Sequence, residues 1–309
     1  MKKLFIISIC VLSSLFGFSQ QIGYLSQFNE TNAFWNPAAT APSTIMSYDL
    51  FVRQQWLGFS GAPRTMYASV MYPLVDQNMS LGGSIYNDST GPLSRIGIKL
   101  NYAYKLKGIL SEDAVLAMGI SAAFQQFSFN GSDETFVDQE DGLIASGRES
   151  TTVPFVSAGI YYNTHPEDYD RGANSFYFGL AYNQVYASDL LVNESNFELQ
   201  QHVFFTVGGK IMSYDSYFEP SISTNFVKPD VLDYIFSLKY EKEDAFWTGL
   251  GYSSVNDIAV QGGFIIDRFM NNRYAKLKIG ALANILITQT GRDLGPGFEM
   301  FISYQHDLK

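Results

Sequence analysis

The segment 94–107 alternates between two kinds of side chain at every step. One set is mainly apolar or aromatic and runs through Ser94, Ile96, Ile98, Leu100, Tyr102, Tyr104 and Leu106. The other set is small, polar or cationic and consists of Arg95, Gly97, Lys99, Asn101, Ala103, Lys105 and Lys107. Because successive side chains of a β-strand point to opposite faces, this pattern predicts one long strand with an apolar face and a cationic face. A strand that crosses a lipid bilayer needs roughly 9–11 residues, about twice the usual globular length.

The same alternation recurs along most of the chain. Charged residues opposite apolar ones suit a barrel with lipid outside and water inside, whereas a soluble secreted β-sandwich would bury those charges without solvent. We therefore predict an all-β fold, a transmembrane antiparallel up-and-down β-barrel of about fourteen strands, an even number as in bacterial outer-membrane barrels. The predicted strands are 45–56, 64–73, 79–87, 94–107, 114–129, 153–165, 174–184, 201–213, 217–227, 231–242, 245–253, 257–269, 274–287 and 295–308.

The N-terminal residues have the features of an export signal. Two lysines precede an apolar run over 4–18, which is too short to span a membrane as a helix. We predict an N-terminal signal peptide at 1–20, followed by an outer-membrane β-barrel domain at 21–309. The first part of this domain, 21–43, is an irregular N-terminal segment without the alternation of a strand. The single cysteine, Cys10, lies in the signal, so the exported chain would have no disulfide.

Composition supports export to a membrane and limits the other partners. Aromatic residues make up 16% of the chain, which suits the aromatic girdles of a membrane barrel. The net charge is −10 and no basic cluster is present, which argues against nucleic-acid binding. Outer-membrane lipid is the partner that the alternating strands predict.

No motif in the sequence predicts a catalytic, cofactor or metal site. His165, His202 and His306 fall on or beside different predicted strands, without the spacing of a ligand set. We therefore predict a protein that is not an enzyme. The acidic loop 130–152 could hold calcium, but Asp138–Gly142 lacks the full ligand spacing, and a hydrated surface loop is the favoured interpretation.

The two longest loops, 130–152 and 185–200, both follow odd-numbered predicted strands. If both chain ends are periplasmic, both loops face outward, as the long loops of such barrels do. Inside the barrel, isolated charges are costly, so we expect lumenal lysines to pair with lumenal carboxylates. The expected lysines are Lys99, Lys105, Lys276 and Lys278, with Asp257 and Asp267 among their partners.

The segment 53–65 has an unusual composition for a hairpin connection. It reads Arg-Gln-Gln-Trp-Leu-Gly-Phe-Ser-Gly-Ala-Pro-Arg-Thr. Glycine allows close backbone approach, proline fixes the chain, and Trp with Arg is common at recognition sites. A tight hairpin that carries an aromatic girdle residue is the simpler alternative.

This segment resembles the signature of the PorP/SprF family of outer-membrane proteins, which is associated with the type IX secretion system of Bacteroidota. The matching residues of the segment are Arg53, Gln55, Trp56, Gly58, Phe59, Gly61, Pro63 and Arg64. A second matching motif lies near the N-terminus and comprises Ser26, Gln27, Asn36 and Pro37. The chain departs from the family pattern in lacking a glycine soon after Asn36-Pro37-Ala38 and a closing aromatic residue at its C-terminus.

The resemblance implies an outer-membrane component that supports secretion and cell-surface attachment of a large partner protein, such as an adhesin with a C-terminal sorting domain. It also implies a link to gliding motility. Some family members resemble parts of the core machinery that bind its periplasmic ring components, whereas others resemble dedicated partners of one adhesin, and the sequence alone does not decide between these two groups. Loops 130–152 and 185–200 would then contact the cargo, and the 53–64 hairpin would shape the lumen mouth. The alternative is a passive channel or transporter for small or hydrophobic solutes.

Overall fold

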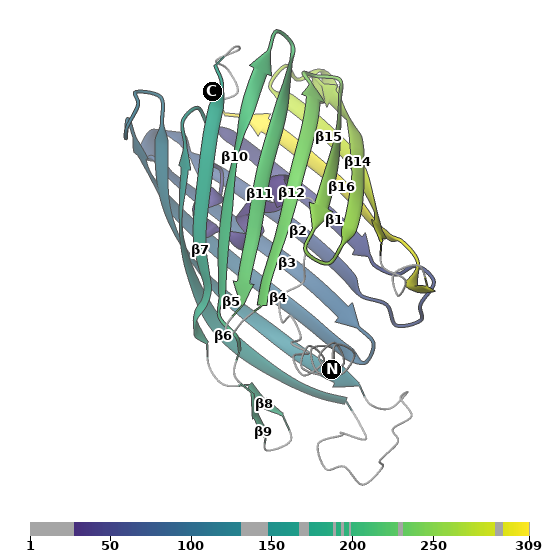
Figure 1. The fold of residues 1–309 in the computed structure, drawn as a ribbon. Coiled ribbons are helices and arrows are strands. Elements are labelled where there is room, and N and C mark those ends of the chain that lie inside the picture. Colours follow the sequence, from purple (N-terminus) through teal and green to yellow (C-terminus); the bar gives the residue numbers. More distant parts are fainter. Residues whose placement is uncertain are drawn as a thin grey trace, which may run out of the picture.

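The chain folds into a closed antiparallel β-barrel of fourteen strands (Figure 1). The structure is a computed structural model that describes residues 28–130, 148–166, 173–187, 190–192, 195–197, 199–227, 231–287 and 293–308. The barrel strands are β1 (Ile45–Gln54), β2 (Arg64–Leu74), β3 (Met79–Thr90), β4 (Leu93–Lys107), β5 (Val115–Asn130), β6 (Arg148–Asn163), β7 (Ser175–Ala187), β10 (His202–Ser213), β11 (Ser216–Val227), β12 (Val231–Lys242), β13 (Phe246–Ser253), β14 (Asp257–Asp267), β15 (Ala275–Leu286) and β16 (Gly297–Asp307). Each strand pairs with its sequence neighbour in the barrel, and β1 closes the sheet against β16. The predicted fold class is confirmed.

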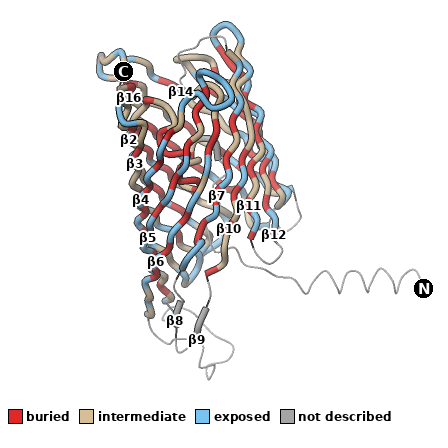
Figure 2. The backbone as a smooth tube through the Cα atoms, turned by 90° about the vertical axis from the view of Figure 1, so that its left-hand side faces the viewer, coloured by how far each residue is buried: buried red, intermediate tan, exposed pale blue. Residues whose placement is uncertain are grey.

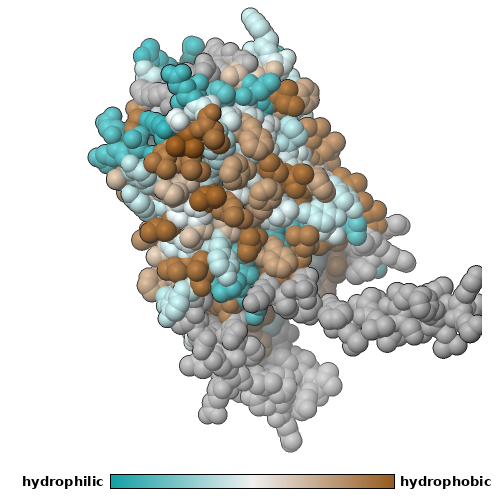
Figure 3. Space-filling model, turned by 60° about the vertical axis from the view of Figure 1, so that its left-hand side comes forward, coloured by the Kyte–Doolittle hydropathy of each residue, from teal (hydrophilic) through white to brown (hydrophobic). Residues whose placement is uncertain are grey.

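Strand β4 shows why the alternation requires lipid outside. Ile98 and Leu100 are 56% and 63% exposed on the outer wall, whereas Lys99 between them is 3% exposed. The same alternation of buried and exposed positions follows the other strands (Figure 2). Figure 3 shows apolar side chains over the middle of one outer face, with hydrophilic side chains gathered at its upper end. Such a surface is stable only where lipid covers it.

The two ends of the barrel differ in the length of their connections. Strands β5 and β7, which precede the longest connections of the chain, both end at the lower end of the barrel in Figure 1. The opposite end has short turns, such as the two residues between β10 and β11. Because outer-membrane barrels have long extracellular loops and short periplasmic turns, we infer that the lower end is the extracellular one.

Some predicted segments differ from the structure or lie outside its described residues. Within the predicted loop 185–200, the short strands β8 (Leu190–Val192) and β9 (Ser195–Phe197) form a separate two-stranded sheet. The signal peptide 1–20 and residues 131–147 of the acidic loop lie outside the described residues. In the described part of the chain, no helix is long and apolar enough to cross a membrane.

The segment before β1 lies inside the barrel, where Figure 1 shows it as short purple helices surrounded by strands. It contains η1 (Phe28–Thr31), α2 (Asn32–Trp35) and η2 (Pro37–Ala39). Residues 28–44 are called the plug below. The sequence did not predict whether this segment enters the lumen or lies along its periplasmic rim.

Candidate functional site

The barrel wall holds the plug by donating hydrogen bonds to its backbone carbonyls. Lys99 Nζ on β4 donates to the Phe34 carbonyl at 2.7 Å. Asn183 Nδ2 on β7 donates to the Trp35 carbonyl, also at 2.7 Å. These donors satisfy backbone acceptors that such short helical turns leave open, so the lumen wall replaces the solvent that the plug excludes.

Asn36 links the plug to a strand in the middle of the chain. Its Oδ1 accepts a hydrogen bond from the Ala38 backbone N–H at 2.9 Å, as an N-cap side chain does, and Pro37 occupies the first position of η2. The Nδ2 atom of Asn36 donates to the Ile160 carbonyl on β6, also at 2.9 Å. The Asn-Pro pair of the N-terminal motif therefore both shapes the plug and attaches it to the wall.

Three glycines on neighbouring strands make room for Asn36 to Ala38. They are Gly119 on β5, Gly159 on β6 and Gly179 on β7, and they are called the glycine seat below. A Cβ atom added at Gly119 would lie 2.3 Å from the Ala38 nitrogen, and one added at Gly159 would lie 2.2 Å from Asn36 Oδ1. Only glycine allows the plug backbone to approach the sheet this closely.

Aromatic packing fixes the part of the plug before Asn36. The Phe34 ring meets Tyr67 and Tyr86 edge to face, with centroids 4.9 and 5.6 Å apart. The Trp35 ring lies 4.6 Å from Phe204 on β10. These ring pairs stabilise the seated plug by more than the burial of their apolar area alone would give. They also attach the plug to strands on different sides of the lumen.

An ion-pair network holds the start of the plug to the opposite wall. Lys239 Nζ on β12 lies 2.5 Å from Glu30 Oε1 and 3.0 Å from Glu241 Oε2, and Lys278 Nζ lies 3.6 Å from Glu241 Oε1. Burial by itself raises the pKa of the Glu30 carboxyl, but attraction by Lys239 and Lys278 outweighs it and holds this pKa below its usual value.

Two of the four lysines predicted to pair with lumenal carboxylates do so, but their partners are not the predicted carboxylates. Lys276 pairs with Asp244 at 2.7 Å, and Lys278 pairs with Glu241. Lys99 and Lys105 donate instead to plug carbonyls, those of Phe34 and Ser43. The two carboxylates predicted as lysine partners bind other groups. Asp257 accepts hydrogen bonds from Ser253 and Asn284, and Asp267 pairs with Arg268.

The structure places Arg53 inside the wall, at the seam that closes the barrel. Its Nε lies 3.1 Å from Glu299 Oε1 on β16, with both side chains almost fully buried, and the two residues are register partners. Arg53 is therefore withdrawn from the extracellular surface, unlike the rest of the motif.

The remaining residues of the 53–64 motif lie at the extracellular rim and bridge neighbouring connections. The Leu57 N–H donates to the Pro296 carbonyl before β16, and the Gly91 N–H of the β3–β4 turn donates to the Gly61 carbonyl. Gln55, Trp56 and Pro63 are half-buried; Gly58, Phe59, Gly61 and Arg64 are exposed. Of the N-terminal motif, Asn36 and Pro37 lie in the plug, while Ser26 and Gln27 lie outside the described residues.

The three histidines lie apart in different surroundings. His202 is fully buried and bonds to Asn225, His165 lies 3.8 Å from Asp113, and His306 packs near Tyr274. Within the described residues, no group of three or more His, Cys, Asp or Glu side chains is arranged to hold a metal ion. The acidic stretch considered for calcium, Asp138–Gly142, is not among those residues.

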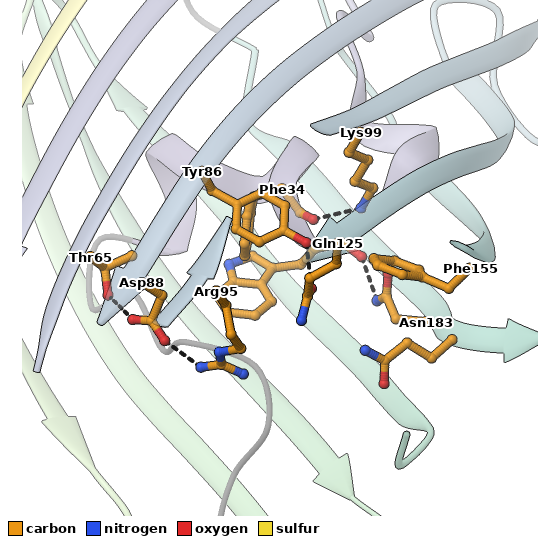
Figure 4. Close-up of a pocket in the computed structure, with 11 residues that line it drawn as sticks. Phe34, Thr65, Tyr86, Asp88, Arg95, Lys99, Gln125, Phe155 and Asn183 are labelled. Atoms are coloured by element: carbon orange, nitrogen blue, oxygen red, sulfur yellow. Dashed lines mark hydrogen bonds and ion pairs between the residues drawn. The ribbon is translucent and has the colours of Figure 1, made fainter. Parts of the chain in front are cut away.

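A pocket lies between the plug and the strands β2 to β7 (Figure 4). Phe34 and Trp35 of the plug form its inner side, and Arg95 and Asp88 stand nearer the extracellular ends of β4 and β3. Arg95 forms an ion pair with Asp88, which also accepts a hydrogen bond from the Thr65 hydroxyl at 2.6 Å. Sequence reasoning missed this pocket, the glycine seat and the Glu30–Lys239 pair, because each depends on the strand register.

Comparison with known proteins gives one family and one fold. The sequence model of the family described as "type IX secretion system membrane protein PorP/SprF" matches residues 17–304. Two similar solved structures are the CymD monoaromatic hydrocarbon channel (12% identity, 95% of each chain covered, TM-score 0.54) and the P. putida toluene transporter TodX (8% identity, 88% of this chain and 92% of that chain covered, TM-score 0.50). At these identities the likeness shows the fold alone. No curated protein sequence matches the chain.

Proposed function

Because the chain belongs to the PorP/SprF family of type IX secretion system membrane proteins, we propose that it supports secretion of one large partner protein, such as an adhesin, and holds that partner at the cell surface. The family and the fold are those of a secretion-system barrel in the bacterial outer membrane, which is not a class of enzyme. The partner and the attachment role are the proposal.

The observation that carries the proposal is the plugged lumen. The plug is hydrogen-bonded to β4, β6 and β7, and its Glu30 pairs with β12, so it is attached to several parts of the wall. A large partner could not pass through this lumen while the plug is seated. The geometry therefore favours a barrel that receives its partner on the extracellular end over one that conducts it.

The rim loop between β1 and β2 supplies an apolar contact surface for that partner. Leu57 and Phe59 are 59% and 55% exposed there, at the end of the barrel with the long loops. Aromatic residues on a well-supported loop are common centres of protein recognition. Loops 130–152 and 185–200 would extend this surface, although much of both lies outside the described residues.

A passive channel or transporter for small or hydrophobic solutes is the second candidate. The structures of similar fold are called a monoaromatic hydrocarbon channel and a toluene transporter, and these names are the support for it. Single-channel recording on purified protein separates the two candidates. A barrel that conducts with its plug seated would give steady currents, whereas an attachment barrel would give none.

The test of the proposal is a pull-down of tagged protein from cell envelopes in mild detergent, read by mass spectrometry. We expect one very large secreted protein with a C-terminal sorting domain. Recovery of periplasmic ring components alone would instead indicate a part of the core machine, and recovery of neither would contradict both roles.

A rim variant makes this test specific. The double substitution Leu57→Ser and Phe59→Ser should lower partner recovery by about tenfold, because exposed aromatic anchors carry much of an interface energy. Val255→Ser is the matched control, since Val255 is 49% exposed on another extracellular turn, between β13 and β14. Equal recovery by both variants would remove the rim loop from the proposed interface.

A further inference from the structure

Strand β7 contains a bulge that turns two consecutive polar side chains toward the lumen. Between the register pairs that flank Ser157 of β6, β7 has two more residues than β6. Within this bulge, Asn183 donates to the Trp35 carbonyl of the plug at 2.7 Å. Its neighbour Gln184 lines the pocket between the plug and the wall. A regular strand would point one of these two side chains toward the lipid.

The backbone of Gln184 adopts an unfavourable conformation to reach this position. Its φ is +57°, in the left-handed region that residues with a side chain rarely occupy. Bulges and left-handed residues of this kind often redirect a side chain beside a functional site. The cost of the conformation is offset only if the amide gains an interaction inside the lumen.

Gln184 and the residue opposite it have an unmet demand for hydrogen bonds. Gln184 is 1% exposed, and neither its Nε2 nor its Oε1 has a hydrogen-bond partner among the described residues. Ser157 is also 1% exposed, and its Oγ has no partner in the same part of the chain. Buried polar groups without partners are costly, and ordered water is the usual partner where protein atoms do not reach them.

The pocket beside Gln184 has the size of one water molecule. Its volume is about 40 Å³, which is enough for one water and too little for an aromatic ring. Phe34 and Trp35 of the plug form its inner side, and Lys99 lines it from β4. Lys99 Nζ gives one of its three protons to the Phe34 carbonyl, as the dashed line in Figure 4 shows, so the pocket has a donor besides the Gln184 amide.

We propose that this pocket binds one ordered water molecule, which the amide of Gln184 holds between the wall and the plug. The water supplies a partner that the buried amide requires, and it fills the space that the side chains leave. Asn183 then bonds the plug directly, and Gln184 beside it holds the water that lies against the plug. The bulge therefore provides two adjacent contacts to the plug where a regular strand would provide one.

The first test detects the water in the folded barrel by NMR in detergent micelles. The side-chain amide protons of Gln184, labelled with ¹⁵N in a deuterated protein, should show a nuclear Overhauser effect to water. An effect of opposite sign in the rotating frame identifies a long-lived water and excludes exchange of the amide protons. The control is Asn36, whose buried amide has a protein partner at both its oxygen and its nitrogen and should give no such signal.

The second test is the variant Gln184→Met, which replaces the amide with an apolar side chain of similar length. If the amide holds a water, the variant loses that hydrogen bond, and the heat-induced shift of the barrel on a gel should occur at least about 2 °C lower. A dry, unpaired amide predicts the opposite change, because its removal would stabilise the barrel. Gln77→Met, at an exposed position between β2 and β3, is the matched control and should leave the temperature unchanged.

Two outcomes would overturn the proposal. Absence of a water signal at Gln184 in the folded wild-type barrel would show that the pocket is dry. A higher transition temperature for Gln184→Met would show that the amide has no partner in the folded protein. If this variant does not fold, the wild-type water signal decides alone. Neither measurement involves a partner protein, so both outcomes are independent of the proposed role in secretion.

Discussion

The Oδ1 atom of Asn36 occupies the space that a side chain would need at position 159. A Cβ added to Gly159 would lie 2.2 Å from this oxygen, so the plug and the wall fit only while that residue is glycine. The fit joins an N-terminal residue to a strand 124 positions further along the chain, through the bond to Ile160. Substitutions at this contact can therefore test whether the plug closes the lumen.

Substitution of the glycine seat should open the barrel. In Gly159→Val, the Cβ and its methyl groups would displace Asn36, and we expect steady single-channel currents where the wild type gives none. Gly83→Val is the control, because a Cβ at Gly83 meets Val70 and Leu100 only at ordinary contact distances of 3.7 and 3.8 Å. Equal currents from both variants would show that the seat does not govern conduction.

Loss of the Asn36 side chain should loosen the plug without unfolding the barrel. Asn36→Ala removes both the N-cap bond and the bond to Ile160, and an N-cap is worth about 1 kcal/mol. Backbone amides of residues 33–40 should then exchange with deuterium at least about fivefold faster, as 1 kcal/mol implies. Exchange in β12, which Asn36 does not touch, serves as the internal reference.

The Glu30–Lys239 pair should make plug retention depend on pH. The pKa of Glu30 in the folded protein is lowered from its ordinary value of 4.5, so its contribution is present above that value and is lost only as pH falls through the folded pKa. Wild-type barrels should therefore stay closed at about pH 5 and begin to conduct only well below the ordinary pKa of Glu.

The variant Glu30→Gln provides the matching comparison for this pH series. It lacks the titrating carboxylate, so its conductance should not change over the pH range in which the wild type opens. A wild-type transition at or above the ordinary pKa of Glu would contradict the role given to this pair.

The buried ion pair between Arg53 and Glu299, at the seam between β1 and β16, should stabilise the folded barrel. Removing one partner of a buried pair costs about 3–5 kcal/mol, whereas replacing both with apolar residues is often neutral. We expect less folded barrel in membranes for Arg53→Met and recovery in Arg53→Met with Glu299→Met. The exposed pair Lys242–Asp215 offers the control, because Lys242→Met should change stability by less than about 1 kcal/mol.

Strand positions and faces could be predicted from sequence because lipid enforces the alternation. β4 and β12 lie within one residue of their predicted bounds. The strand β6 begins at Arg148, five residues earlier than predicted, because Arg148–Thr152 is polar on both faces and gives no alternating signal. The pair β8 and β9 was missed for a similar reason, since three-residue strands carry no period.

The site was less predictable because it depends on which strands meet. The inward direction of Arg53 could have been inferred, since it shares its parity with Asp49 and Phe51 on β1. The glycine seat could not, because Gly119 and Gly159 become neighbours only through the register of β5 and β6. Motif resemblance grouped Arg53 with the other residues of the 53–64 hairpin, but the structure places Arg53 in the seam and the others at the rim.

The position of the glycine seat has a consequence for the order in which the molecule assembles. The plug precedes β1, yet its seat belongs to β5, β6 and β7, and Thr44 at its end bonds Asp307 of the last strand at 2.8 Å. The first described segment of the polypeptide can therefore settle only after the middle strands have paired, and its last residue is fixed only once the final strand is in place. Filling of the lumen is therefore a late event, although the segment that fills it precedes all fourteen strands in the chain.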